Sequence, residues 1–367
     1  MARFQHISGK RRVFVKLREA GIISRAELAR QCSLTRPAVS AIIEELLAEG
    51  MVKELGPGHS TGGKPPIMLE FQPRSRCAIG IDLGGDLRIE GVICDLACGI
   101  VAADSMEYEN DIDSILDAIT RLVKRLRGRY SSMIPAGIGI AVSAIVNAGN
   151  EAISSYTLDV GRKNLARKVE ALTGLPVKLE RRPNAAAIAE ALFGAGQNYK
   201  QMVYITSGRG VGAGIVIDGE IYRGSHGFSG EIGRMLLPDS RQLEAAARPS
   251  QLPVEYRSQT GNKVDFAQFM QLYHDGDAVA HELVRRNAEY LAYAAQVAAN
   301  IFDPAAIVLG GDVLEFGDEH FYHFQKVLNQ NSAAYNLGYA PEILRSVFGH
   351  RGVAVGGAQL ILDELVF

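Results

Sequence analysis

Residues 78–96, AIGIDLGGDLRIEGVICDL, read as two β-strands joined by a turn that carries two glycines. Alone, this segment is also compatible with a plain hairpin. Two further strand-and-glycine segments follow, YITSGRGVGAGIVIDGEIYRG at 204–224 and AAIVLGGDVLEFGDEHF at 305–321. Glycine turns of this kind let the backbone approach a phosphate group closely. Three of them in one chain predict an α/β body built around such turns.

Composition sets the outer bounds. The chain has 367 residues, of which 47% are hydrophobic and 22% charged, so two or three globular domains are expected. No apolar run approaches the ~20 residues that span a bilayer, and the first residues lack a secretory apolar core. We therefore expect a cytoplasmic protein with no membrane partner. The four cysteines form no CxxC pair, which indicates buried thiols in a reducing compartment.

The first 76 residues differ in charge from the rest. They hold 13 Lys and Arg against 7 Asp and Glu, which gives +6, and the remainder is −8. A basic head attracts phosphate backbones, although a solvated surface can carry the same charge. Charge alone does not separate these two interpretations.

The head has the pattern of a helix-turn-helix. An apolar run at helical spacing ends at Gly21, and Ser24 with Glu27 forms a predicted capping box for a second helix. Thr35 is a predicted N-cap for a third helix over residues 36–49. The third helix would lie in the major groove, where Arg36 and Ser40 reach bases or phosphates. The alternative is a protein-interaction module with the same helices.

Two strand-like runs after Gly50 enclose a glycine-rich loop, which predicts a wing. His59 and Lys64 in this loop are candidate contacts to the DNA backbone or minor groove. Together with Thr35, Arg36 and Ser40, they complete the predicted DNA-binding set.

Residues 23–66 resemble the winged helix-turn-helix that opens the repressors of the ROK family, a group of repressors and sugar kinases. The body resembles the ROK body along nearly its whole length, including SHGFSGEIGRMLL at 225–237 and HRGVAVGGAQLILDEL at 350–365. The resemblance implies two α/β lobes of the actin-like and hexokinase-like kind around a ligand cleft. The implied domains are the head at 1–70, a linker at 71–76, a first lobe at 77–190 and a second lobe at 191–367, with the last helix returning to the first lobe.

The body departs from the kinases of this family at the catalytic base. The kinases carry Glu-Asn-Asp ahead of Ala-Asn-Ala-Ala, and the aspartate accepts the proton of the attacking sugar hydroxyl. This chain has Glu180, Arg181 and Arg182 at the matching positions. Because arginine stays protonated, Arg182 cannot be that base.

The turns that match the family's phosphate-binding turns are altered as well. The first keeps Asp82, Gly84 and Gly85 but ends in Asp86, where the family has threonine. The second keeps Gly208, Gly210 and Gly212, with Arg209 in place of threonine. We interpret both as vestigial and expect no enzyme activity and no cofactor.

The family's zinc signature is missing. Arg234 stands where the family has histidine in Gly-Glu-Ile-Gly-His, and the following loop has no cysteine, so no metal is expected. Glu231 and Glu244 match sugar-contacting glutamates of the family. Arg181, Arg182 and Arg234 converge on the same place, which suggests a sugar acid or sugar phosphate effector. The alternative is that these arginines pair with Glu180, Glu231 and Glu244 and close a vestigial cleft.

The resulting prediction is a homodimeric or homotetrameric regulator of sugar metabolism, most simply a repressor, that binds a double-stranded DNA operator. Two alternatives remain at this point. One is an active sugar kinase with a DNA-binding head. The other is a repressor controlled by a protein partner in place of a small molecule.

Overall fold

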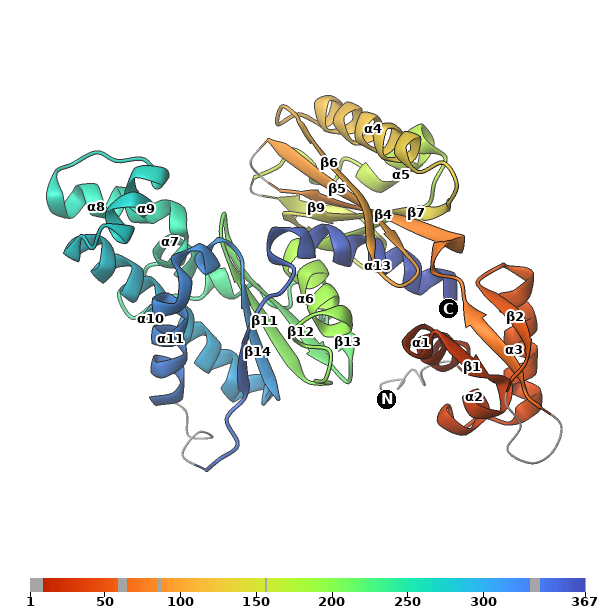
Figure 1. Cartoon of the computed structure of the whole chain (residues 1–367). Helices are drawn as coiled ribbons and strands as arrows, with labels where there is room; N and C mark the ends of the chain where they lie inside the picture. Colours follow the sequence, from red (N-terminus) through yellow and green to blue (C-terminus); the bar gives the residue numbers. More distant parts are fainter. Residues whose placement is uncertain (1–8, 59–64, 85–86, 156, 331–336, 367) are drawn as a thin grey trace.

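The computed structural model describes residues 9–58, 65–84, 87–155, 157–330 and 337–366. Figure 1 shows a small N-terminal head beside two larger α/β lobes. This arrangement confirms the predicted fold class, a winged helix-turn-helix followed by a two-lobed body.

The head consists of three helices and a three-stranded sheet. The helices are α1 (Gly9–Ala20), α2 (Arg25–Gln31) and α3 (Arg36–Ala48), and the strands are β1 (Ile22–Ser24), β2 (Val52–Pro57) and β3 (Ile67–Phe71). β3 pairs with both β1 and β2 in antiparallel fashion, so the predicted wing hairpin is present and β1 is an added edge strand.

The predicted helix caps of the head are present with one difference. The Ser24 hydroxyl accepts a hydrogen bond from the Glu27 amide at 3.2 Å, and the Thr35 hydroxyl accepts one from the Ala38 amide at 3.4 Å. The carboxylate of Glu27 does not complete a capping box. It accepts hydrogen bonds from Arg30 and Gln31 one turn along the helix, where a cation is within reach.

The first lobe is a five-stranded sheet in the order β10-β7-β4-β5-β6, with β10, β7 and β4 parallel and the rest antiparallel. Its elements are β4 (Arg76–Leu83), β5 (Arg88–Asp95), β6 (Ile100–Glu107), α4 (Ile112–Arg129), β7 (Ile134–Val142), α5 (Leu165–Thr173) and β10 (Val177–Arg181), with a small hairpin of β8 (Ala144–Val146) and β9 (Ala152–Ser155). α4 and α5 cover one face of the sheet.

The second lobe repeats this strand pattern in the order β13-β12-β11-β14-β15. Its strands are β11 (Met202–Ser207), β12 (Val211–Ile217), β13 (Glu220–Ile221), β14 (Ala306–Gly310) and β15 (Glu342–Arg345). One face is covered by α7 (Leu243–Ala247), α8 (Leu252–Thr260), α9 (Phe266–His274), α10 (Ala278–Phe302) and α11 (Gly317–Gln330). The short 3₁₀ segments are η1 (Pro73–Ser75), η2 (Ile232–Arg234), η3 (Pro249–Gln251), η4 (Asp312–Phe316) and η5 (Gly349–Arg351).

Two helices, α6 (Arg182–Phe193) and α13 (Gly352–Val366), lie between the two sheets (Figure 1). α13 packs on β4 and β7 of the first lobe and also against α6, while α6 packs on β11 and β12 of the second lobe. α13 therefore covers the first sheet although it ends the chain, and α6 connects the lobes. The domain boundaries given above remain predictions.

The head is joined to the body by a continuous apolar core. Phe14, Leu17 and Phe71 of the head belong to one buried cluster with Cys94 of the first lobe and Val355 of α13. η1 links the two units, and the Pro73 carbonyl accepts a hydrogen bond from the Leu96 amide at 3.0 Å. We infer that the head is docked on the body rather than tethered by a loose linker.

Glycines make the close approach of α13 to the first sheet possible. A Cβ atom at Gly80 would lie 1.8 Å from the Ala354 carbonyl oxygen, and one at Gly139 would lie 1.8 Å from the Gly357 carbonyl oxygen. Because both obstacles are helix backbone, neither can move aside cheaply. The sheet therefore requires glycine at these two positions.

Gly139→Ala should lower the free energy of unfolding by at least about 1–3 kcal/mol, because α13 must shift away from the sheet. Urea denaturation measures the change. Gly128→Ala is the matched control, since no atom lies within 4 Å of the added methyl in α4 and alanine favours helix by up to about 1 kcal/mol. If Gly139→Ala keeps wild-type stability, α13 does not pack as described.

Candidate functional site

A cavity of about 470 Å³ lies between the two lobes. The first lobe contributes the β7–β8 segment around Ser143, and the second contributes the β11–β12 turn, α7 and the start of η4. Among the described residues, the cavity wall carries five arginines, Arg181, Arg182, Arg209, Arg234 and Arg248, and three carboxylates, Glu231, Glu244 and Asp312. Cations therefore outnumber anions on the wall.

Arg182 is bound to Asp82 rather than facing the cavity alone. Its Nε and Nη2 atoms donate to the two carboxylate oxygens of Asp82 at 2.6 and 2.9 Å, a bidentate pair between the start of α6 and the end of β4. Burial lowers the pKa of the Arg182 guanidinium, but the charge and hydrogen bonds of Asp82 outweigh this effect and raise it. Arg182 thus holds the Asp82 carboxylate of the first turn that matches the family's phosphate-binding turns.

Arg181 is also engaged within the protein. Its guanidinium, 3% exposed, donates to the Glu231 carboxylate and to the Ser229 carbonyl. The Nε atom of Arg234 lies 3.2 Å from the other oxygen of Glu231. Two of the three predicted effector arginines thus share one carboxylate, while Glu180 pairs with Arg223 at 2.7 Å and the cavity stays open.

The second glycine turn is enclosed by acidic side chains. A Cβ atom at Gly208 would lie 2.8 Å from a carboxylate oxygen of Asp312, and one at Gly210 would lie 2.9 Å from Glu244. Glu244 accepts a hydrogen bond from the Val211 amide at 3.1 Å. At Gly212 the same atom would lie 2.8 Å from Pro183 of α6, so all three predicted turn glycines sit at close contacts.

The first glycine turn is only partly described. Gly84 is buried, and its carbonyl accepts a hydrogen bond from the Tyr108 hydroxyl. Burial and the nearby charge of Asp82 raise the pKa of Tyr108 to about 12. Gly85 and Asp86 lie outside the described residues.

The predicted DNA-binding residues of α3 cluster at its first turns. Thr35 and Arg36 are exposed and Ser40 is half-buried. Among the described residues, the Arg36 side chain has no hydrogen bond or ion pair, so its donors are available. His59 and Lys64 of the wing loop lie outside the described part of the chain.

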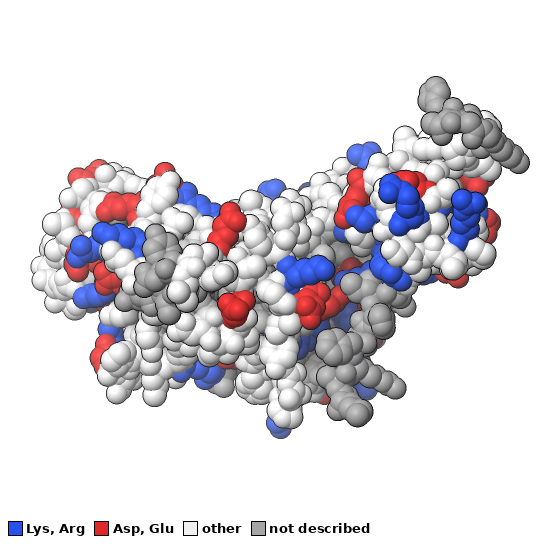
Figure 2. All heavy atoms as spheres, turned by 90° about the horizontal axis from the view of Figure 1, so that it is seen from below, with Lys and Arg blue, Asp and Glu red and all other residues white. Residues whose placement is uncertain are grey.

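Other basic residues of the head are paired. Arg25 contacts Glu44 and Glu54 at 2.8 Å each, and Lys10 lies 3.1 Å from Glu45. Figure 2 accordingly shows blue and red side chains mixed over the head at the right of the view. In the described part of the head, the positive charge is therefore divided between residues in ion pairs and the unpaired Arg36 side chain.

Comparison with known proteins fits this geometry. Residues 78–364 match the model of the ROK family, and residues 17–53 match a model of winged helix-turn-helix DNA-binding domains. The chain belongs to the ROK family. Both findings confirm the resemblance seen in the sequence. In the described part of the chain, no helix is long and apolar enough to cross a membrane.

Individual relatives include both regulators and kinases. A xylose repressor of Bacillus subtilis is 26% identical over 362 residues, covering 94% of this chain and 92% of its own. A ROK family transcriptional regulator, a homologue of the E. coli MLC protein, superposes with a TM-score of 0.83 at 22% identity over 98% of this chain and 96% of its own. A ROK glucokinase of Streptomyces griseus, solved with glucose and AMPPNP, gives 0.70 at 25% identity over 77% of this chain and 98% of its own.

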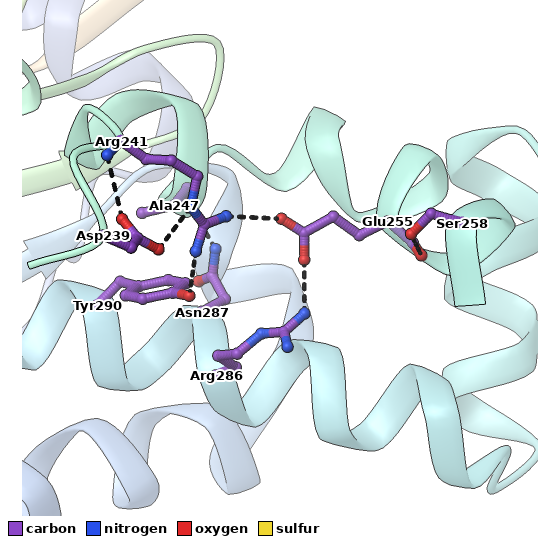
Figure 3. Close-up of polar contacts among 8 residues, drawn as sticks. All are labelled: Asp239, Arg241, Ala247, Glu255, Ser258, Arg286, Asn287 and Tyr290. Carbon is purple, nitrogen blue, oxygen red and sulfur yellow. Dashed lines mark hydrogen bonds and ion pairs between the residues drawn. The ribbon is translucent and has the colours of Figure 1, made fainter. Parts of the chain in front are cut away.

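The ROK zinc site does not fit the residues of this chain. Among the described residues, no group of three or more His, Cys, Asp or Glu side chains is placed to hold a metal ion. The corresponding loop is held by Arg241, which donates to Asp239 at 2.7 Å and to the Tyr290 hydroxyl at 2.6 Å. Figure 3 shows Arg241 also facing Glu255, which is paired with Arg286 at 2.7 Å.

α7 follows this loop and is fixed at its other end as well. The Ala247 carbonyl accepts a hydrogen bond from the Ser207 hydroxyl at 2.6 Å. It also accepts one from the Asn287 side chain at 2.8 Å (Figure 3). Asn287 in turn lies 3.0 Å from Nε2 of His320 on α11. The helix that brings Glu244 to the cavity is thus positioned by polar contacts from β11 and α10.

Sequence reasoning missed Arg248, the residue after α7. Arg248 lines the cavity, and its Nε atom is buried with no hydrogen-bond partner among the described residues. The only signal was a basic residue between the apolar LEAAA run and Pro249. No motif of the family resemblance pointed to it.

His320 should make the second lobe sensitive to acid. It is 1% exposed, and burial lowers the pKa of its imidazole to about 3, with His323 and Arg345 adding to the effect. Below pH 6.5 the His320 imidazole therefore binds a proton in the unfolded chain but stays neutral in the folded chain. The free energy of unfolding falls as the pH drops from 6.5 towards 3. At pH 5 this costs about 2 kcal/mol.

His320→Gln should reduce the loss of unfolding free energy between pH 7 and pH 5 by about that amount, about 2 kcal/mol, as measured by urea denaturation at both values. His323→Gln, on the partly exposed side of the same helix, is the control and should leave the loss unchanged. An unaltered pH dependence in His320→Gln would contradict the assignment.

Proposed function

We propose that this protein is a DNA-binding transcriptional repressor of sugar metabolism whose body senses a small molecule and does not transfer phosphate. The observation that carries the proposal is the bidentate ion pair of Arg182 and Asp82, in a ROK body that is fused to a winged helix-turn-helix. The names of relatives that span almost the whole chain, such as the xylose repressor, support the regulatory role.

The absence of kinase activity follows from the chemistry of the site. Phosphoryl transfer requires a base for the sugar hydroxyl and cations on the phosphates. Arg182 is a permanent cation at the position that matches the base, and its guanidinium occupies both carboxylate oxygens of Asp82 in the first of the altered phosphate-binding turns. The residues present therefore do not fit a metal–nucleotide complex.

The effector of this repressor would bind in the cavity between the lobes. Arg181, Arg182, Arg234, Glu231 and Glu244 line it, and the excess of arginine favours a sugar acid or sugar phosphate over a neutral sugar. Hydroxyl groups of such a ligand can be bound by the carboxylates, and its anionic group by guanidinium.

Ligand binding could reach DNA through contacts of α1 with the body. Arg11 of α1 pairs with Glu220 of β13 in the second lobe and lies 3.9 Å from Asp363 of α13. Arg18 lies over the Phe193 ring at the end of α6, 4.6 Å from its centroid. These contacts come from both sides of the cleft. A change in the angle between the two lobes would therefore change the position of the head on the body. A homodimer or homotetramer would then place two heads on one operator.

The DNA-binding role is tested by selecting sheared genomic DNA of the source organism with the purified full-length chain and measuring affinity for the enriched fragments. Arg36→Ala should weaken binding to an enriched fragment by about 5- to 150-fold and leave non-specific binding nearly unchanged. Arg121→Ala, a surface arginine of α4, is the control. Failure of the wild-type chain to enrich any fragment would contradict the proposed function.

A further inference from the structure

We propose that Arg248 is the residue that binds the anionic group of the effector, and that Arg181 and Arg182 serve as internal ion-pair partners. This inference deepens the proposed function, on which it rests, by assigning the anion to a place in the cavity and to a residue of the second lobe. The ligand class is a small molecule with a carboxylate or phosphate group.

Two arginines of the cavity wall, Arg181 and Arg182, are already paired within the protein. Arg182 is held by both oxygens of Asp82, and Arg181 is held by Glu231 and the Ser229 carbonyl. A ligand anion at either guanidinium would compete with a buried carboxylate for the same positive charge. These two side chains are therefore poor receptors for a further anion.

Arg248 differs because its side chain has no hydrogen bond or ion pair among the described residues. Its Nε atom is buried, although the side chain as a whole reaches the cavity wall. A buried donor without a partner costs roughly 1–3 kcal/mol, and more when it is charged. An oxyanion in the cavity would supply the missing acceptor, and guanidinium binds carboxylate and phosphate with paired hydrogen bonds.

Hydrogen bonds hold the backbone around Arg248 in place. Its backbone amide donates to the Glu244 carbonyl at 3.2 Å, and the preceding carbonyl, that of Ala247, is held by Ser207 and Asn287. Figure 3 shows Asn287 and Tyr290 projecting from α10 towards Ala247 and Arg241. Both ends of α7 are thus anchored on one long helix, so the backbone that carries Arg248 is fixed before a ligand arrives.

The position of Arg248 beside the second glycine turn indicates where the anion would bind. Ser207 immediately precedes Gly208, so the hydrogen bond from its hydroxyl to Ala247 sets Arg248 beside the turn 208–211. Asp312 lies against Gly208 of the same turn. The anion would therefore lie on the α7 side of the turn, with Glu244 and Glu231 left to accept hydrogen bonds from ligand hydroxyls.

The experiment is isothermal titration calorimetry of the full-length chain with four probes: inorganic phosphate, glucose 6-phosphate, gluconate and glucose. The wild type should bind at least one anionic probe more tightly than glucose. Arg248→Gln should weaken that binding by about 10- to 100-fold, and Arg248→Lys, which keeps the charge, should weaken it less. Preference for gluconate or for glucose 6-phosphate identifies carboxylate or phosphate as the group bound.

Arg257→Gln, an exposed arginine of α8, is the matched control and should bind the probe as the wild type does. Three results would overturn the proposal: equal affinity of Arg248→Gln and wild type, tighter binding of glucose than of every anion, or no binding of any anionic probe. Enrichment of genomic DNA by Arg248→Gln without ligand is measured separately. If the wild-type chain enriches no DNA fragment, the proposed function is wrong. The affinities for the probes would still show whether Arg248 binds an anion.

Discussion

The ion pair between Arg182 and Asp82 is the constraint on which the site depends. It joins the end of β4 to the start of α6, two segments a hundred residues apart, at the bottom of the cleft between the lobes. Removing either partner would leave a largely buried charge without compensation, which typically costs about 3–5 kcal/mol. The same guanidinium places a permanent cation at the position that matches the family's catalytic base, and it neutralises the Asp82 carboxylate.

The rest of the cavity follows from how the other charges are used. Glu231 is shared by Arg181 and Arg234, Glu244 accepts the Val211 amide, and the loop that replaces the zinc site is held by Arg241. These contacts order the walls of the cleft without a metal and satisfy most of the arginines. Among the described residues of the cavity wall, Arg248, which directly follows the short helix α7, has a buried Nε atom without a hydrogen-bond partner. We propose that a cleft arranged in this way binds an anion and does not transform one.

The sequence predicted those parts of the fold that depend on neighbouring residues. Ser24 and Thr35 cap their helices as expected, and the three glycine turns follow their strands. It also predicted that Arg182 could not be a base, because that follows from the residue type. It did not predict that Arg182 would bind Asp82, nor that the fully buried Glu190 would accept the Val347 and Phe348 amides, because such pairings depend on distant segments that meet only in the folded chain. Arg248 was missed for the same reason. Only the folded chain shows that its buried Nε atom has no hydrogen-bond partner among the described residues.

The most direct test of a cleft that senses but does not catalyse is ³¹P nuclear magnetic resonance of the full-length chain with ATP, Mg²⁺ and a panel of hexoses, pentoses and amino sugars. A working kinase turns over about 1–100 times per second, so a sugar phosphate would accumulate within minutes. We predict that the ATP resonances keep their intensity and that no sugar phosphate resonance appears with any sugar. The appearance of a sugar phosphate at the expense of the γ-phosphate would contradict the account, because Arg182 and Asp82 could not then be locked in the ion pair described here.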